Sequence, residues 1–305
     1  MTYIKLIDLC MEIYSKQLDK LLKSLESEFT RRYPPRLNLV DKCVEPSATI
    51  YWIENDDFKV LSTLYSSNSK DTYIVQGSPP EPYTNESPVF FLLQVIARSL
   101  VKKGYIILTD SVSIGGKSKN VLLLGFPHTG KSTIASIAIS NNYNVFTTEN
   151  TVLRIDRDRL RIITGTRVLV YDPAVKELYG VNITPHSRTK HGYEIIDLEK
   201  IDGIREFDRE IIVDEIYLVY TSFSSTGFSR RPIKGRKISK LLWMFTTSLL
   251  KGLDYYYPHP LDTPLDENII NSINQFIGYV ETKYSDRFFE VYGSPLEVFK
   301  SITTD

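Results

Sequence analysis

The sequence predicts an α/β protein built on a P-loop-containing mixed sheet flanked by helices, with a small N-terminal region of one helix and a β-meander. Aliphatic residues lead directly into a glycine-rich loop and then into a helical pattern. Short β-branched runs alternate with helical patterns over the C-terminal part of the chain. A Pro- and Ser-rich stretch, Gly77–Ser87, separates this C-terminal pattern from the N-terminal helix and meander, so we expect regions at 1–86 and 87–305.

Composition narrows the class of protein. The chain has 305 residues with 37 basic and 37 acidic side chains, enough to bury a sizeable core without a net field that attracts nucleic acid or lipid. We expect no nucleic-acid partner and no membrane partner, because no long uncharged apolar stretch and no leader pattern occur. Cys10 and Cys43 are too few for a disulfide framework or a four-thiolate zinc site. A reducing, cytoplasmic location is therefore expected.

The N-terminal region begins with apolar residues spaced by three and four, which predicts a long amphipathic helix that packs on its own domain or joins copies into a homo-oligomer. These residues are Ile4, Ile7, Met11, Tyr14, Leu18, Leu21 and Leu25. Three short β-branched and aromatic runs follow, which predict a small antiparallel meander. They are Ala48–Ile53, Phe58–Tyr65 and Thr72–Gln76.

After the linker, capping residues and the spacing of hydrophobic residues predict the positions of helices and strands. A helix has its apolar body at Val89–Val101 and ends at Gly104. Strands are expected at Tyr105–Leu108, Asn120–Leu124 and Asn144–Thr147, further β runs continue through Val219, and the last strand is Phe288–Tyr292. The remaining helices are expected at Lys131–Ser140, Lys237–Leu250, Pro264–Val280 and Pro295–Ile302.

One motif carries chemistry directly. Residues 125–132 fit G-x-x-x-x-G-K-[ST] between a buried strand and a helix, which is the context that a phosphate-binding loop requires. Main-chain N–H groups and the helix N-terminus favour an anion there. Lys131 is placed to reach the β/γ-phosphates and the Ser132 hydroxyl to bind Mg²⁺. The nucleotide-binding candidates are Gly125, Phe126, Pro127, His128, Thr129, Gly130, Lys131, Ser132 and Thr133.

Several charged side chains are candidates to complete this site. His128 either donates to a phosphate or is an exposed loop residue. A carboxylate for Mg²⁺ or for proton transfer comes either from Glu149, at the exit of the strand after the loop helix, or from Asp214-Glu215, which looks like a Walker B strand end. The basic run from Arg230 to Lys237 either neutralises phosphate, docks an acidic partner or is a solvated loop.

These residues also suggest a family. The passage from Tyr105 to Thr133, with its Gly-Gly turn at Gly115-Gly116 and its phosphate loop, resembles the core of HPr kinase/phosphorylase, whose fold is shared with phosphoenolpyruvate carboxykinase. In that family a short helix leads from the loop to a strand ending in two adjacent aspartates, and the equivalent stretch here is Tyr143–Asn150. Pro232–Lys237, followed by an apolar helix, is similar to the family's basic loop. The resemblance covers roughly residues 87–302 and is that of a distant relative.

The resemblance implies roles for three residues beyond the cradle. Lys131, Glu149 and Arg236 would be catalytic, with Glu149 as metal ligand or general base and Arg236 in the loop that positions phosphate and partner. Ser132 and Glu149 would hold Mg²⁺. The sequence departs from the family at Thr148, which replaces one of the two acids, at His128, where glycine is usual, and at Asp110-Ser111-Val112, where a His-Ala-Ser-like stretch is usual. Its first 86 residues do not resemble the bacterial enzyme's first domain.

The leading hypothesis is a Mg²⁺-dependent kinase that transfers a phosphoryl group from ATP, or another phosphoryl donor, to a hydroxyl of a protein serine or a small alcohol. One alternative is an ATPase or nucleotide-dependent switch with Asp214-Glu215 as Walker B. Another is a nucleotide-binding module without catalysis. The base remains open among Glu149, Asp110 and Asp214, and the acceptor is not specified by the sequence.

Overall fold

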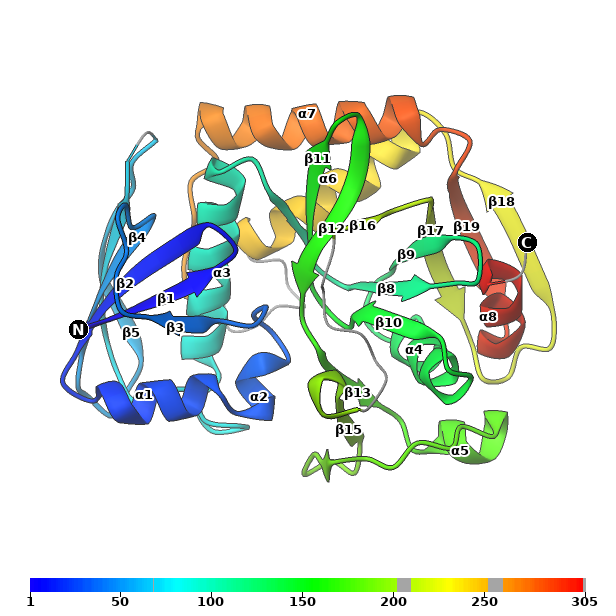
Figure 1. Cartoon of the computed structure of the whole chain (residues 1–305), viewed down its shortest axis with the longest axis horizontal. Coiled ribbons are helices and arrows are strands. Elements are labelled where there is room, and N and C mark those ends of the chain that lie inside the picture. The colour runs from blue at the N-terminus through cyan, green and yellow to red at the C-terminus, as the bar shows by residue number, and fades with distance from the viewer. Residues whose placement is uncertain (68, 202–209, 252–259, 304–305) are drawn as a thin grey trace. The chain divides into compact units, whose positions relative to one another are not determined.

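The computed structural model is mixed α/β and describes residues 1–67, 69–201, 210–251 and 260–303 (Figure 1). It divides into two compact units. Unit 1 comprises Met1–Ile107 and Thr246–Gln275, and unit 2 comprises Leu108–Phe245 and Phe276–Asp305. Three elements contain residues of both units, namely β7 (Ile106–Leu108), α6 (Arg236–Lys251) and α7 (Glu267–Lys283).

Unit 1 is built on a six-stranded sheet in the order β3-β1-β2-β4-β6-β5. Its strands are β1 (Thr2–Leu6), β2 (Leu9–Ser15), β3 (Asn38–Val40), β4 (Ala48–Ile53), β5 (Lys59–Leu64) and β6 (Asp71–Gln76). Its complete helices are α1 (Leu18–Leu25), α2 (Glu28–Arg31) and α3 (Ser87–Lys102).

The long N-terminal helix predicted from residue 4 is wrong. Residues 2–15 form the antiparallel hairpin β1–β2, with Ile7 at φ +59° in its turn, and only Leu18–Leu25 is helical. The buried side chains of the hairpin include Ile4 and Leu6 on β1 and Met11 and Ile13 on β2. In each pair the residues are two apart, which is the period of a strand, although the whole set of apolar positions also fits a helical spacing.

The predicted antiparallel meander is also wrong in its pairing. β4 pairs with β6 in parallel, β2 pairs with β4 in parallel, and β5 forms the edge strand antiparallel to β6. The three strands exist near the predicted positions, but β5 lies at the edge of the sheet next to β6 and not between β4 and β6. Strand order depends on long-range packing and not on the local composition that predicted the strands.

Helix α3 explains why the expected boundary after residue 86 falls inside unit 1. Phe91 of α3 contacts Trp52 and Tyr73 of the sheet, with ring centroids 6.1 and 5.6 Å away. The fully buried Arg98 of α3 donates to Asp71 of β6 through Nε at 2.9 Å. Because a buried ion pair and an aromatic cluster join α3 to the sheet, the helix belongs to the N-terminal core.

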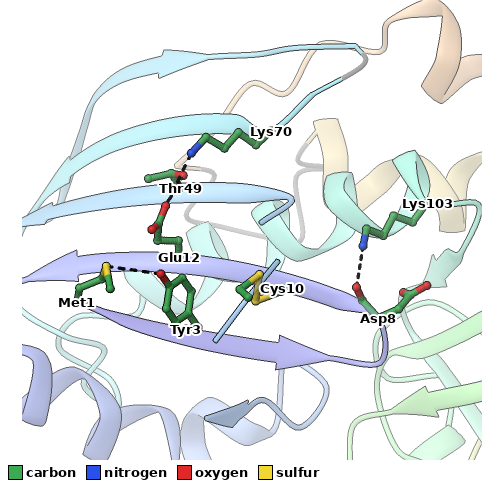
Figure 2. Close-up of a disulfide and its surroundings, with 9 residues drawn as sticks. Met1, Tyr3, Asp8, Cys10, Glu12, Thr49, Lys70 and Lys103 are labelled. Atoms are coloured by element: carbon green, nitrogen blue, oxygen red, sulfur yellow. Dashed lines mark hydrogen bonds and ion pairs between the residues drawn. A yellow bond between two sulfur atoms is a disulfide. The ribbon is translucent and has the colours of Figure 1, made fainter. Parts of the chain in front are cut away.

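The two cysteines, expected to be reduced, are joined in a disulfide (Figure 2). Cys10 lies on β2 and Cys43 follows β3, with their Cα atoms 6.2 Å apart. The Cys10 carbonyl also accepts the Ser47 N–H at 2.7 Å, so the segment that precedes β4 runs alongside β2. This contact follows from the sheet order, which the sequence did not reveal.

Unit 2 contains a second six-stranded sheet, in the order β10-β8-β9-β17-β19-β18. Its strands are β8 (Ser111–Gly115), β9 (Asn120–Leu124), β10 (Asn144–Thr147), β17 (Glu215–Thr221), β18 (Phe228–Pro232) and β19 (Phe288–Gly293). The three strands β9, β17 and β19 are parallel, whereas β8 runs antiparallel between β9 and β10, and β18 runs antiparallel at the other edge. The carboxyl ends of β9, β10, β17 and β19 therefore lie at one edge of the sheet.

Helices α4 (Lys131–Ser140) and α8 (Pro295–Thr303) pack on one face of this sheet around a shared apolar cluster that includes Leu123, Ile134 and Ile302. Two smaller sheets complete the strands. One contains β11 (Thr151–Asp156), β12 (Arg159–Gly165), β16 (Ile211–Ile212) and β7, and the other contains β13 (Val168–Tyr171), β14 (Ser187–Arg188) and β15 (Glu194–Asp197). The remaining elements are α5 (Ala174–Tyr179) and the 3₁₀ turn Leu198–Lys200.

The predictions in this part of the chain agree closely with the structure. The bounds of β9, β10 and α4 are those expected, and helices occur as predicted in α3 and α6, with α7 starting three residues later than predicted. The strand β19 and helix α8 each extend one residue past the predicted end. Within the described ranges, no helix combines the length and the apolar character needed to cross a bilayer.

Candidate phosphate-binding site

The predicted phosphate loop joins the carboxyl end of β9 to the amino end of α4, beside β8 and β10 (Figure 1). The Gly125 N–H donates to the Asp110 carbonyl, and the Thr129 N–H and hydroxyl both donate to the Phe126 carbonyl. Gly130 has φ +92°, a backbone conformation that favours glycine, immediately before the helix. His128 is exposed in the loop at φ +64°.

Lys131 is folded back onto its own loop. Its buried Nζ donates to the Gly125 carbonyl at 2.5 Å and to the Phe126 carbonyl at 2.9 Å. The same ammonium group lies 3.6 Å from Asp110 Oδ1. These oxygens provide the lysine with negatively polarised partners, so an incoming phosphate would compete with them for the same cation.

Asp110 is the residue at this site with the most unusual environment. It occupies the turn before β8 at φ +51°, is 3 % exposed, and its Oδ2 has no hydrogen-bond partner among the described residues. Burial raises the pKa of Asp110 to about 7, an effect that Lys131 opposes and Glu149 reinforces. A carboxyl group of this kind changes protonation near neutral pH.

Glu149 reaches the same edge from the exit of β10. Its backbone is fixed on both sides, because its carbonyl accepts the Ser111 N–H at 2.9 Å and its N–H donates to Thr166 Oγ1 at 2.9 Å. Its half-buried carboxylate makes no ion pair or hydrogen bond with the described residues, although its charge acts on Asp110. The structure therefore brings Lys131, Asp110 and Glu149 together.

Buried hydroxyl groups tie the two acidic turns to each other. Ser111 and Ser113 of β8 hydrogen-bond at 2.7 Å to Thr151 and Thr147, respectively, and these two threonines bond to each other at 2.7 Å. A connected network of this type has each hydroxyl satisfied, so it fixes the geometry of the turns that carry Asp110 and Glu149.

Thr148 stands where the resembling family has an acid, and the structure gives this residue a packing role. Its side chain is buried, and its hydroxyl donates to the Val168 carbonyl at 2.9 Å and lies 3.2 Å from the Thr166 carbonyl. The hydroxyl thus joins the exit of β10 to β13 and is not directed to solvent.

The donor groups here fit a magnesium ion. Mg²⁺ takes oxygen ligands, commonly one or two carboxylates together with substrate phosphates and water. The half-buried Ser132 hydroxyl makes no hydrogen bond to a described residue, and the Glu149 carboxylate, which also has no such partner, supplies further oxygens at the same edge. No cluster of three or more His, Cys, Asp or Glu side chains that could hold a metal is found in the described ranges.

The Walker B alternative is not supported by the position of Asp214 and Glu215. Glu215 begins β17 opposite Val121, whereas the loop follows Leu124, which is opposite Leu218. Four residues at about 3.3 Å each place Glu215 roughly 13 Å along β17 from Val219, which lies against Gly125 at the start of the loop. Asp214 accepts the Asn120 N–H at 2.7 Å, and Glu215 pairs with Lys119 and Arg230, so both acids have structural partners.

Arg236 also lies away from the loop, contrary to its expected role. The basic run leaves the edge strand β18, and the Ile233 N–H donates to the Phe288 carbonyl at the amino end of β19. Three strand spacings separate β18 from β9, which is about 14 Å across the sheet. The part of α6 that reaches the loop is Phe245, whose ring lies 5.5 Å from Phe126, nine residues after Arg236.

Three residues contribute to this site although none of them was assigned a role in it from the sequence. Thr166 receives the N–H groups of both Glu149 and Asn150, and Thr221 donates its N–H and hydroxyl to the Thr129 carbonyl at 3.0 and 2.9 Å. Ser111 links the Asp110 turn to Glu149. All three contact residues at least 16 positions away in the chain, so no local motif indicates them. The chain matches no protein-family model and no curated protein.

Proposed function

We propose that this chain is a Mg²⁺-dependent phosphotransferase that moves the terminal phosphoryl group of ATP to a hydroxyl acceptor, on a P-loop kinase fold of the HPr kinase type. One observation carries the proposal: a glycine-rich loop at a helix N-terminus has a buried lysine and two carboxylates at the same edge of the sheet. Phosphoryl transfer requires positioning and charge neutralisation, and these groups are suited to both.

Each residue has a role that follows from its environment. Backbone N–H groups of residues 125–133 and Lys131 hold the phosphates, with Lys131 exchanging its carbonyl partners for phosphate oxygens. Ser132 and Glu149 would hold Mg²⁺, which supplies charge neutralisation at the phosphates when bound. Asp110, whose pKa is raised to about 7 by burial, is suited to accept the proton of the acceptor hydroxyl. We assign no role at the phosphates to Arg236, because it lies away from the loop.

The test is Mg²⁺-dependent ADP formation with a panel of hydroxyl metabolites and cell-extract proteins as acceptors. We expect Lys131→Ala and Asp110→Asn each to lower the acceptor-dependent rate about 10²-fold or more, and chelation of Mg²⁺ to abolish it. Glu215→Gln is the matched control, because it changes a carboxylate at the far end of β17 and should leave the rate unchanged. Far-UV circular dichroism checks that each variant is folded.

The outcomes separate the alternatives. A Lys131→Ala variant that turns over ATP at the wild-type rate refutes the assignment. A Glu215→Gln variant that binds nucleotide and cannot hydrolyse it supports the ATPase alternative instead. Tight nucleotide binding without ADP formation for any acceptor indicates the non-catalytic module, for which the structural role of Thr148 is the supporting observation.

A further inference from the structure

Two aromatic side chains lie beside the candidate phosphate site. Phe223 follows β17, and Tyr179 is the last residue of α5. Their ring centroids are 6.1 Å apart with an interplanar angle of 37°. Phe223 is 45 % exposed, so its contact with Tyr179 leaves nearly half of a large apolar side chain in water. An exposed aromatic side chain of this kind is suited to stack on a planar ligand.

The connection to the loop is short and well fixed. Thr221 donates both its N–H and its hydroxyl to Thr129 of the loop, and Phe223 follows Thr221 by two residues, a span of at most about 7 Å. The Ser225 N–H donates to the Ser222 carbonyl at 3.1 Å, and this places Phe223 within a tight turn. Phe223 is therefore held close to the loop by main-chain bonds.

Tyr179 is positioned by the packing of α5 on α4. Val175 of α5 and Val181 just after it pack in the apolar cluster that contains Ile134 and Ile137 of α4. The Asn182 N–H also donates to Ser140 Oγ at the end of α4. These contacts hold α5 against α4, and the Tyr179 ring meets Phe223 at the sheet edge where β17 ends.

We propose that Phe223 and Tyr179 form a stacking platform for the base of the nucleotide whose phosphates bind at residues 125–133, which rests on the proposed function. A backbone cradle recognises phosphates and not bases, so a base needs its own contact. Stacking on aromatic side chains tolerates any base because each base has a π face. The ligand class is therefore a nucleoside triphosphate, with similar dependence on Phe223 for ATP and GTP.

The experiment compares ATP, GTP and inorganic tripolyphosphate by titration calorimetry in the presence of Mg²⁺. The wild-type chain should bind ATP about tenfold or more tightly than tripolyphosphate. Phe223→Ala should weaken ATP and GTP binding about tenfold while leaving tripolyphosphate binding unchanged, and Phe223→Trp should retain ATP binding. Tyr193→Ala, at an exposed tyrosine between β14 and β15, is the control and should change neither ligand.

A second measurement does not depend on affinity. In F223W, bound ATP should quench the fluorescence of the added tryptophan, and tripolyphosphate should not. Equal losses for ATP and tripolyphosphate in F223A, or an unchanged ATP affinity, would overturn the platform and leave the proposed function standing. Failure of the wild-type chain to bind any of the three ligands would overturn both.

Discussion

Gly130 allows a direct measurement of how tightly the loop at residues 125–130 is held against β17. A Cβ atom at Gly130 would lie 1.8 Å from Thr221 Oγ1, and the residue has φ +92°. In Gly130→Ala the left-handed backbone costs about 1–2 kcal/mol. Thr221 must also turn away and lose the hydrogen bond from its hydroxyl to the Thr129 carbonyl, which is worth about 1 kcal/mol. We expect Gly130→Ala to lower the free energy of unfolding by about 2–3 kcal/mol.

Gly180→Ala isolates the backbone component of this cost. Gly180 has φ +65°, and a Cβ atom added there would meet no other atom within 4 Å, so the substitution should cost only about 1–2 kcal/mol. In the Thr221→Ala background, Gly130→Ala should cost no more than Gly180→Ala, because the clashing hydroxyl is gone and its hydrogen bond is already lost. Urea denaturation of the wild type, Gly130→Ala, Thr221→Ala and the double variant gives a double-mutant cycle, for which we expect a coupling energy of about 1 kcal/mol. Equal costs for Gly130→Ala and Gly180→Ala in the wild-type background would refute the contact between loop and strand.

Two further predictions concern buried charges. Burial raises the pKa of Asp110 to about 7, so the folded state binds more protons than the unfolded state between about pH 4 and 7. The free energy of unfolding therefore falls as the pH rises through that range, and the effect of Asp110 levels off above it. Asp110→Asn should therefore raise the free energy of unfolding at pH 8 by about 2–4 kcal/mol and have little effect at pH 4, as measured by urea denaturation across pH; a difference that does not grow with pH contradicts the assigned cause. Asp71→Asn should lower the free energy of unfolding by about 3 kcal/mol, because Asp71 is buried with Arg98, whereas Asp262→Asn, at an exposed partner of Lys251, should cost less than about 1 kcal/mol. Equal costs at the two aspartates would show that burial does not set the strength of these pairs.

The part of the site carried by consecutive residues could be predicted from the sequence. The loop at 125–132 requires a strand before it and a helix after it, and both elements depend on nearby residues: the aliphatics that precede Gly125 and the helical segment from Lys131. Glu149 could also be placed, because it follows the next strand and because the carboxyl ends of strands in the same direction meet at one edge.

The remaining features depend on strand register. Asp110 meets Lys131 because β8 and β9 form a hairpin, with Ser111 opposite Leu124. The sequence predicted the Gly115-Gly116 turn but not the strand that precedes it, so it left Asp110 as one of three candidate bases. Arg236 was placed at the site through resemblance, and the register of β18 with β19 instead leaves the basic run at the amino end of β19. Glu215 has the sequence of a Walker B residue, but a strand has two ends, and only its pairing with β9 identifies which end meets the loop.

The error at the N-terminus has a different physical origin. In residues 4–14 the apolar positions fit both a helical period and two short strands joined by a turn, and Ile7 was counted as a helical core position although it lies in the turn at φ +59°. An isolated helix and an isolated hairpin of this length are both marginal, so neither pattern is decisive alone. In the structure β2 pairs with β4, and Phe91 of α3 packs on Trp52 of β4, so the hairpin is part of a larger sheet with a covered face. The strands at the start of the chain are therefore stabilised by contacts with residues 48–53, which the apolar spacing of residues 4–25 does not contain.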